Sequence, residues 1–382
     1  MAQRMIWNQT AYFGAGSISV IPGELALRGY TKALVVTDAP LLASGVVERV
    51  TGLLDEAAFA YDVYSDVVPN PTIENVQTGV AALAASGADV LIAIGGGSPQ
   101  DTCKAIGIIT ANPEFSDVRS LEGVAPTTKP SVPIIAIPTT AGTASETTIN
   151  YVITDVERQR KFVCVDPHDI PILAIVDSEM MASAPRSLKV ATGLDALTHA
   201  IEGYTTAGAW ELSDLFHLKA IQVIAGALRG AAEGDPAAAE RMALGQYVAG
   251  MGYSNVGLGL VHAMAHPLGA FYSAPHGVAN GILLAPVMAF NAEATGEKFR
   301  DIAAAFGVDV SGMSTEAART AAVDAVAALT RDLGNPVTLR EIGAKESDIP
   351  ALAQAASDDV CAGGNPRPAT VAEIEELYRA LY

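Results

Sequence analysis

The spacing of hydrophobic positions changes about halfway along the chain. In the first 180 residues, short and nearly continuous apolar runs alternate with stretches of helical periodicity, for example at 73–86. Continuous apolar runs of this length are typical of parallel strands that are covered on both faces of a sheet. The four clearest predicted strands are 33–37, 90–94, 133–137 and 172–176. This alternation predicts an α/β domain.

Beyond about residue 187 the strand pattern almost disappears and helical periodicity dominates. The predicted helices span 187–204, 213–233, 236–253, 260–268, 277–290, 314–333 and 370–381. The change of character falls between residues 183 and 187. We therefore predict an α/β domain at 1–185 and an all-helical domain at 186–382.

Composition and charge narrow the classes of protein. The chain has 382 residues, of which 50% are hydrophobic, and a formal net charge of −19. This charge opposes binding to nucleic acids and to anionic membranes, because both are negatively charged. We see no apolar run long enough to span a bilayer, no signal peptide, and no metal-type spacing among the three cysteines. We therefore expect a soluble, cytoplasmic protein with no nucleic-acid or membrane partner.

A glycine-rich turn follows the predicted strand 90–94. Residues 95–104 read GGGSPQDTCK. Glycines let the backbone approach a ligand closely, Ser98 could cap the next helix, and the free N–H groups at a helix start favour a phosphate. Three consecutive glycines are more than a tight turn needs, so phosphate binding is favoured over a simple turn.

Two further segments follow predicted strands at their carboxyl ends, where α/β sheets bind ligands. Asp38 follows strand 33–37, where its carboxylate could accept from ribose hydroxyls and repel a 2′-phosphate, although an acid there is also a common helix cap. Residues 138–146 read PTTAGTASE and offer several hydroxyls. The Gly-x-Gly-x-x-Gly fingerprint is absent, so an ordinary Rossmann motif is not predicted.

Histidines are concentrated in the second half of the chain. His262, His266 and His276 lie within fifteen residues, and His199 stands four residues after Asp195. Residues at i and i+4 share a helical face, and the small or apolar neighbours indicate an interior position. One carboxylate and three imidazoles suit Fe²⁺ or Zn²⁺. Spacing alone allows either His266 or His276 as the last ligand.

These motifs resemble those of the iron-containing (group III) alcohol dehydrogenases, from residue 4 to the C-terminus. The most specific stretches are 95–101, 138–143, 161–168, 193–204 and 257–269. The resemblance implies a dehydroquinate synthase-like architecture and a homodimer, with NAD and Fe²⁺ as cofactors and Zn²⁺ as the alternative metal. It also implies that the metal ligands are Asp195, His199, His262 and His276.

The same resemblance assigns further roles. His266 then lies near the nicotinamide and is our candidate proton acceptor, with a relay through the ribose hydroxyl and water as the alternative. The residues that match cofactor-contacting positions are Asp38, Asn70, Gly96, Gly97, Ser98, Thr139, Thr140, Thr143, Asn150 and Lys161. The chain departs from the family at Ala144, where many members carry glycine, and at Tyr253, where close relatives have phenylalanine.

The implied activity is the NAD(H)-linked interconversion of a short-chain alcohol or diol and its aldehyde. Lactaldehyde and 1,2-propanediol are the expected pair, and 1,3-propanediol, ethanol, butanol and glycerol are the alternatives. A dehydroquinate synthase-like lyase would need Lys and Arg near the metal to hold phosphate and carboxylate, but both are absent from 191–218 and 242–297. A non-catalytic homologue would show a broken ligand set or glycine turn, and both are intact.

Overall fold

The computed structural model describes residues 2–158 and 160–382. The chain forms two compact units. The first takes in the chain up to Thr140 together with Ala144–Ala184, and the second comprises Ala141–Thr143 and Pro185–Tyr382. Three residues that lie between two strands of the first unit therefore belong to the second unit.

A six-stranded sheet organises the first unit, with the order β1-β8-β5-β4-β2-β3 and every pairing parallel. Its strands are β1 (Thr10–Phe13), β2 (Lys32–Asp38), β3 (Ala60–Val67), β4 (Val90–Gly95), β5 (Ile134–Pro138) and β8 (Leu173–Val176). The four strands predicted from continuous apolar runs are β2, β4, β5 and β8. The predicted α/β fold with a parallel sheet is confirmed.

Four strands were not predicted from the sequence, because their residues are only partly buried. β1 and β3 are the two edges of the sheet, and β3 exposes half of its residues. A separate antiparallel hairpin pairs β6 (Asn150–Asp155) with β7 (Arg160–Val165). Its side chains alternate between buried and half-buried, which breaks the apolar run.

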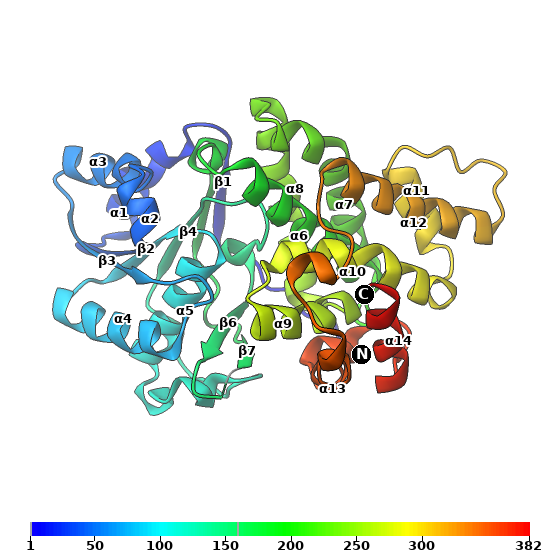
Figure 1. Cartoon of the computed structure of the whole chain (residues 1–382). Coiled ribbons are helices and arrows are strands. Elements are labelled where there is room, and N and C mark those ends of the chain that lie inside the picture. The colour runs from blue at the N-terminus through cyan, green and yellow to red at the C-terminus, as the bar shows by residue number, and fades with distance from the viewer. Residues whose placement is uncertain (1, 159) are drawn as a thin grey trace. The chain divides into compact units, whose positions relative to one another are not determined.

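Both faces of the sheet are buried, as its continuous apolar strands require. Odd-numbered residues of β2, such as Val35, pack with α1 (Ile21–Arg28) and α3 (Glu48–Glu56). Even-numbered residues, such as Leu34, pack with α4 (Ile73–Ser86) and α5 (Gly97–Ala111). Figure 1 shows α1, α3 and the short α2 (Ala39–Ala43) on one side of these strands, with α4 and α5 on the other.

Helices alone build the second unit from residue 185 onward, a stretch that the structure describes completely. They are α6 (Arg186–Thr205), α7 (Glu211–Ala232), α8 (Pro236–Val256), α9 (Leu260–Tyr272), α10 (His276–Asn291), α11 (Lys298–Ala305), α12 (Thr315–Asp332), α13 (Ile349–Ser357) and α14 (Val371–Ala380). The short α11 and α13 were not predicted. α9 continues through Pro267 and ends four residues beyond its predicted end.

The helix α6 lies at the centre of this unit. It is buried almost continuously from Val190 to Thr205, and Leu194, Leu197 and Ile201 belong to the core. α6 packs against α7, α8 and α10. Polar side chains on such a buried helix are shielded from bulk water, so they need hydrogen-bond partners inside the protein.

One-turn 3₁₀ helices complete the described structure. They span Ser17–Val20, Pro113–Phe115, Val118–Leu121, Ser145–Thr147, Ser178–Met181, Ala292–Thr295, Arg340–Ile342, Glu346–Asp348 and Val360–Gly364. Among the described residues, no helix combines the length and the apolar character that crossing a membrane requires.

Acid is expected to destabilise the second unit through His217 of α7. This ring is fully buried between two glycines, and a Cβ at Gly203 or Gly252 would lie 2.2 or 2.3 Å from its Nε2. Burial lowers the pKa of His217 to about 3. Because the unfolded chain binds a proton near pH 6.5 and the folded chain does not, stability should be lost as the pH falls from about 6.5 toward 3.

The expected loss from His217 alone is about 2 kcal/mol at pH 5. Denaturant unfolding of wild type and His217→Gln from pH 7.5 to 4.5 measures it. The variant should show a shallower dependence on pH, whatever its stability at pH 7.5. Parallel pH dependences for the two proteins would contradict this origin of the acid sensitivity.

Candidate metal centre

The carboxylate and one imidazole of the predicted site come from α6. Asp195 and His199 lie one helical turn apart and are both buried. The Nε2 of His199 is 3.8 Å from Oδ1 of Asp195. The structure therefore confirms that these two side chains share the inner face of a buried helix.

The other two imidazoles come from the starts of neighbouring helices. His262 lies in the first turn of α9, and His276 is the first residue of α10. Gly277 allows α10 to approach α6 at this point, because a Cβ there would lie 1.9 Å from the backbone oxygen of Ala191. His262 is buried, whereas the side chain of His276 is 31% exposed.

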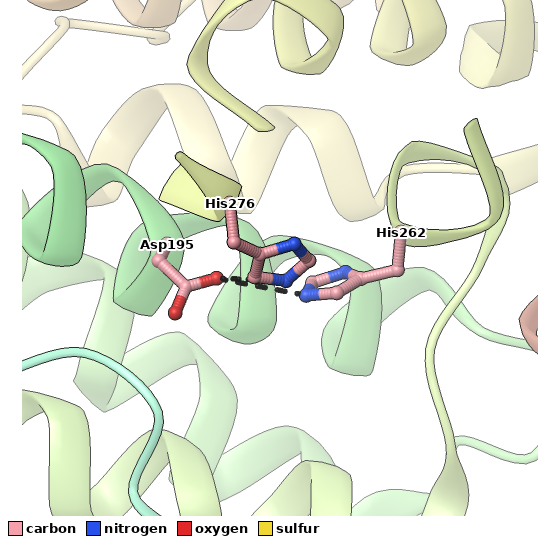
Figure 2. A group of neighbouring side chains, drawn as sticks. All are labelled: Asp195, His262 and His276. Carbon is pink, nitrogen blue, oxygen red and sulfur yellow. Dashed lines mark ion pairs between the residues drawn. The ribbon is translucent and has the colours of Figure 1, made fainter. Parts of the chain in front are cut away.

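Three imidazoles surround one carboxylate oxygen. Oδ1 of Asp195 lies 3.7 Å from Nε2 of His262 and 3.6 Å from Nε2 of His276. Figure 2 shows the polar ends of these three side chains pointing toward one another. His199 lies near the same carboxylate oxygen, since its Nε2 is 3.8 Å from Oδ1 of Asp195. The structure thus brings together all four residues that the resemblance implied as ligands.

The separations of the three imidazoles from Asp195 are close to those expected around a four-coordinate cation. Bonds of roughly 2.0–2.2 Å at tetrahedral angles place neighbouring ligand atoms roughly 3.3–3.6 Å apart. The observed separations from Asp195 are 3.6 to 3.8 Å. Asp195, His262 and His276 each offer a ligand atom within 4.8 Å of the others, and His199 lies beside this group through its contact with Asp195. One carboxylate with three imidazoles is also a donor set that Fe²⁺ and Zn²⁺ accept.

The electrostatics of the site favour a bound positive charge. Burial alone would raise the pKa of Asp195, but His199 and His276 outweigh it and hold that pKa well below its usual range. Burial lowers the pKa of His199 to about 4. Burial also opposes protonation of His262, yet Asp195 and Glu202 outweigh it and raise the pKa of that ring to about 9. A cation must therefore displace a proton to bind His262.

Two polar residues that support the four were missed in the sequence analysis. Oε2 of Glu202 lies 2.6 Å from Nδ1 of His262, and Nδ2 of Asn280 donates to Oδ1 of Asp195 at 2.8 Å. The spacing of residues along the sequence gave a signal for Glu202. Residues 195, 199 and 202 follow the i, i+4, i+7 pattern of one helical face.

His266 does not join the four, although spacing allowed it. Its Nδ1 lies 2.7 Å from Oδ2 of Asp359. The other oxygen of this carboxylate, Oδ1, accepts a hydrogen bond from the N–H of Cys361. His266, Asp359 and Cys361 could form a second cation-type group. However, a separation of 2.7 Å is a hydrogen bond and is too short for two ligands of one cation. The His266 ring stacks 5.4 Å from the His276 ring.

Both departures from the family pattern have structural consequences. The Tyr253 ring stacks on His199 with 4.2 Å between ring centroids, and its hydroxyl donates to the carbonyl of Thr143. A phenylalanine would keep the stacking and lose the hydrogen bond. Ala144 has a φ of +52°, in the region that favours glycine. This conformation explains why glycine suits that position.

The glycine-rich turn forms an open helix start. α5 begins at Gly97 with Gly96 as its N-cap, and no side chain caps it. The expectation that Ser98 caps the helix is wrong, because Ser98 is already the second helical residue. A Cβ at Gly96 would lie 3.0 Å from Oγ1 of Thr140. Uncapped N–H groups beside a hydroxyl are a suitable binding site for phosphate.

Other predicted cofactor residues lie at the carboxyl ends of the strands or on the hairpin. Thr139 follows β5, and its N–H donates to Gly95 at 3.0 Å. Nζ of Lys161 donates to Oδ1 of Asn70 at 2.7 Å. The buried Lys104, which sequence reasoning did not single out, donates to the backbone oxygen of Asn150 at 2.9 Å.

Asp38 ends β2 and caps α2, since its Oδ1 accepts from the N–H of Leu41 at 2.8 Å. The helix-cap interpretation is therefore correct for one oxygen. Binding of ribose would require the other oxygen, so the two roles are compatible on one carboxylate.

The chain is similar to known proteins over nearly its whole length. The chain matches the family described as iron-containing alcohol dehydrogenase over residues 8–178 and its C-terminal part, described as Fe-containing alcohol dehydrogenase family, over 189–382. It is 66% identical to a lactaldehyde reductase of Escherichia coli (strain K12) over 382 residues, covering 100% of both chains. It is 41% identical to an NAD-dependent methanol dehydrogenase of Bacillus methanolicus, covering 96% of each.

A solved structure of a 1,3-propanediol oxidoreductase superimposes with a TM-score of 0.97 at 39% identity, and each chain is covered completely.

Proposed function

Since the chain belongs to the iron-containing alcohol dehydrogenase family, we propose that it interconverts lactaldehyde and 1,2-propanediol with NAD(H). It is an NAD-linked alcohol oxidoreductase, and the substrate pair is the proposal. The identity of 66% to a lactaldehyde reductase over the full length of both chains favours this pair over other short alcohols. The similarity to an NAD-dependent methanol dehydrogenase supports NAD as the cofactor.

The observation that carries the proposal is the convergence of one carboxylate and three imidazoles on α6, α9 and α10. We propose that Asp195, His199, His262 and His276 hold Fe²⁺, with Zn²⁺ as the alternative. When bound, such a cation supplies a Lewis acid that polarises the carbon–oxygen bond of the substrate. The apolar segments around it, without Lys or Arg at 191–218 and 242–297, suit a small uncharged alcohol.

A substrate panel tests the function directly. Protein loaded with Fe²⁺ or Zn²⁺ is assayed for NADH consumption with lactaldehyde, 3-hydroxypropanal, acetaldehyde and butanal. We expect the highest kcat/KM with lactaldehyde. Equal or higher values with another aldehyde would reject the substrate pair, and no turnover with any aldehyde would reject the function.

His266 is the proposed proton acceptor during alcohol oxidation. Its Nδ1 is engaged by Asp359, which leaves Nε2 for the proton. Burial alone would raise the pKa of Asp359, but the hydrogen bond from His266 outweighs it and lowers that pKa. A charged Asp359 then stabilises the protonated ring, as in other Asp–His pairs.

Replacement of His266 by Ala is expected to lower kcat roughly 100-fold or more, the range of general-base catalysis. The loss should be largest below neutral pH, where solvent hydroxide is scarcest. Metal content is the control, since His266 is not one of the four ligands. Near-normal kcat from pH 6 to 9 would exclude His266 and favour a relay through ribose and water.

Asp38 is the proposed determinant of NAD over NADP. We propose that Asp38, Asn70, Gly96, Gly97, Ser98, Thr139, Thr140, Thr143, Asn150 and Lys161 contact the cofactor. A carboxylate at the end of β2 suits ribose hydroxyls and repels a 2′-phosphate. Glycine also tolerates the N-cap position, so Asp38→Gly should cost only a few tenths of a kcal/mol in stability.

Asp38→Gly is therefore expected to raise kcat/KM with NADP relative to NAD by roughly tenfold, because it removes a like charge from the site. Steady-state kinetics with both cofactors measure the ratio, and the melting temperature serves as the stability control. A wild-type enzyme that uses NADP as well as NAD would contradict this role.

The assignment of roles to the two parts of the chain is also proposed. Residues 1–185 would bind NAD and residues 186–382 the metal. We further propose a cytoplasmic homodimer as the working form, as the resemblance to the family implies. Sedimentation analysis tests the dimer.

A further inference from the structure

A buried carboxylate links the centre of α6 to the start of α9. Glu202 is only 4% exposed, and its Oε1 accepts from the N–H of Val261 at 2.6 Å. Its Oε2 lies 2.6 Å from Nδ1 of His262 and 3.3 Å from the backbone nitrogen of the same residue. Both oxygens of this carboxylate are therefore committed to the first turn of α9.

The space for this carboxylate is built into the fold. A Cβ at Gly259, the N-cap of α9, would lie 3.0 Å from Oε1 of Glu202. The first-turn N–H groups of a helix lack partners within it and carry partial positive charge. Glu202 satisfies two of them, so its negative charge is held in one place by the backbone rather than by a cation.

The chemistry of this contact sets the tautomer of His262. A carboxylate can only accept hydrogen bonds, so the 2.6 Å contact requires the proton on Nδ1. Once the ring has given up its second proton, Nε2 carries the lone pair, and this is the atom 3.7 Å from Oδ1 of Asp195. A histidine that donates to a carboxylate is also a stronger and better oriented metal ligand.

We propose that Glu202 is a positioning residue that fixes the orientation and tautomer of His262 for cation binding. This inference rests on the metal centre proposed above and adds to it a residue outside the four ligands. Glu202 does not touch the cation in this assignment. It acts through His262, and its loss should weaken metal binding while leaving all four ligands present.

Glu202→Gln separates this role from simple burial. The glutamine amide has the same shape but must present an N–H either to His262 or to Val261. In the first case the amide donates to Nδ1 and moves the proton to Nε2, which blocks the lone pair. In the second case two donors face each other at the start of α9. The first case loses the productive tautomer, and the second keeps it only with a donor–donor contact that displaces the side chain, so either way His262 is held less well for a cation.

Asn365→Ala provides a matched control for helix capping. Oδ1 of Asn365 accepts from the N–H of Leu260 at 3.2 Å, so this residue supports the same helix start. A Cβ at Gly259 would lie equally close to it, at 3.0 Å. The variant therefore loosens the start of α9 without removing a partner of the His262 ring.

The experiment measures Co²⁺ affinity by chelator competition at pH 7.5 and records the visible absorption of the bound Co²⁺. We expect Glu202→Gln to bind Co²⁺ 10–100-fold more weakly, with altered absorption bands. Asn365→Ala should stay within about threefold of wild type, since partners outside the ligand shell affect affinity mainly through the ligands. Circular dichroism of the metal-free proteins verifies that each variant is folded.

Glu202→Asp supplies a second test that keeps the charge. The shorter side chain should give an affinity between those of wild type and Glu202→Gln, and it decides the question if the glutamine variant does not fold. Wild-type affinity in both Glu202 variants, or equal losses in Glu202→Gln and Asn365→Ala, would overturn the role of Glu202. A wild-type protein that binds no Co²⁺ would instead overturn the metal centre itself.

Discussion

Asp195→Asn is expected to lower both metal affinity and kcat/KM by at least about 100-fold, beyond the range typical of supporting residues. Asp195 is the one carboxylate among the four proposed ligands, and its Oδ1 is the atom from which all three imidazole distances are measured. Asparagine keeps the size of the side chain and removes its charge. A divalent cation at the proposed site would then have neutral ligands only.

The fold should survive this change. Nδ2 of Asn280 donates to Oδ1 of Asp195, and an asparagine can still accept that hydrogen bond through its own oxygen. Metal content by elemental analysis and kcat/KM with NADH are the measurements. Asp214→Asn is the control, because Asp214 pairs with Lys298 at 3.0 Å and takes no part in the site. Full metal content in Asp195→Asn would show that the cation lies elsewhere.

Gly277→Ala should destabilise the second unit and disrupt the metal site in one step. A methyl group there would lie 1.9 Å from the backbone oxygen of Ala191, which cannot swing aside as a side chain can. Overpacking of this kind costs about 3 kcal/mol, and α10 must shift to relieve it. The preceding residue is His276, so the shift also moves a proposed ligand.

The expected results are a melting temperature lower by about 6–12 °C and a clearly weaker metal affinity. Differential scanning calorimetry of the metal-free protein and chelator competition measure the two effects separately. Gly226→Ala of α7 is the matched control. Its Cβ would meet only the guanidinium of Arg241 at 3.6 Å, so a neutral or slightly stabilising effect is expected. An unchanged melting temperature in Gly277→Ala would mean that α10 approaches α6 less closely.

Much of this molecule could be predicted from its sequence where a single physical signal dominates. The continuous apolar runs of β4 and β5 predict buried parallel strands, because both faces of this sheet are covered. The i, i+4 spacing of Asp195 and His199 predicts two side chains on one helical face. The amphipathic hairpin β6–β7 and the edge strand β3 gave no such signal, because solvent reaches part of each.

Contacts between distant segments could not be predicted in the same way. Spacing left His266 and His276 equivalent as ligands, and only the structure shows His266 bound to Asp359. The pairing of Glu202 with His262 spans sixty residues and depends on how α6 meets the start of α9. No local pattern encodes that meeting, although the helical face of α6 does place Glu202 beside the proposed ligands Asp195 and His199.

The three residues Ala141–Thr143 limit how the chain could be divided. They follow β5 in the sequence but belong to the compact unit of the helices, where Tyr253 donates to the Thr143 carbonyl. Cutting the polypeptide at residue 185 would therefore not yield two self-sufficient pieces. The C-terminal fragment would lack the acceptor for Tyr253, the ring that stacks on His199, and its histidine would lose part of its support before any cation was offered.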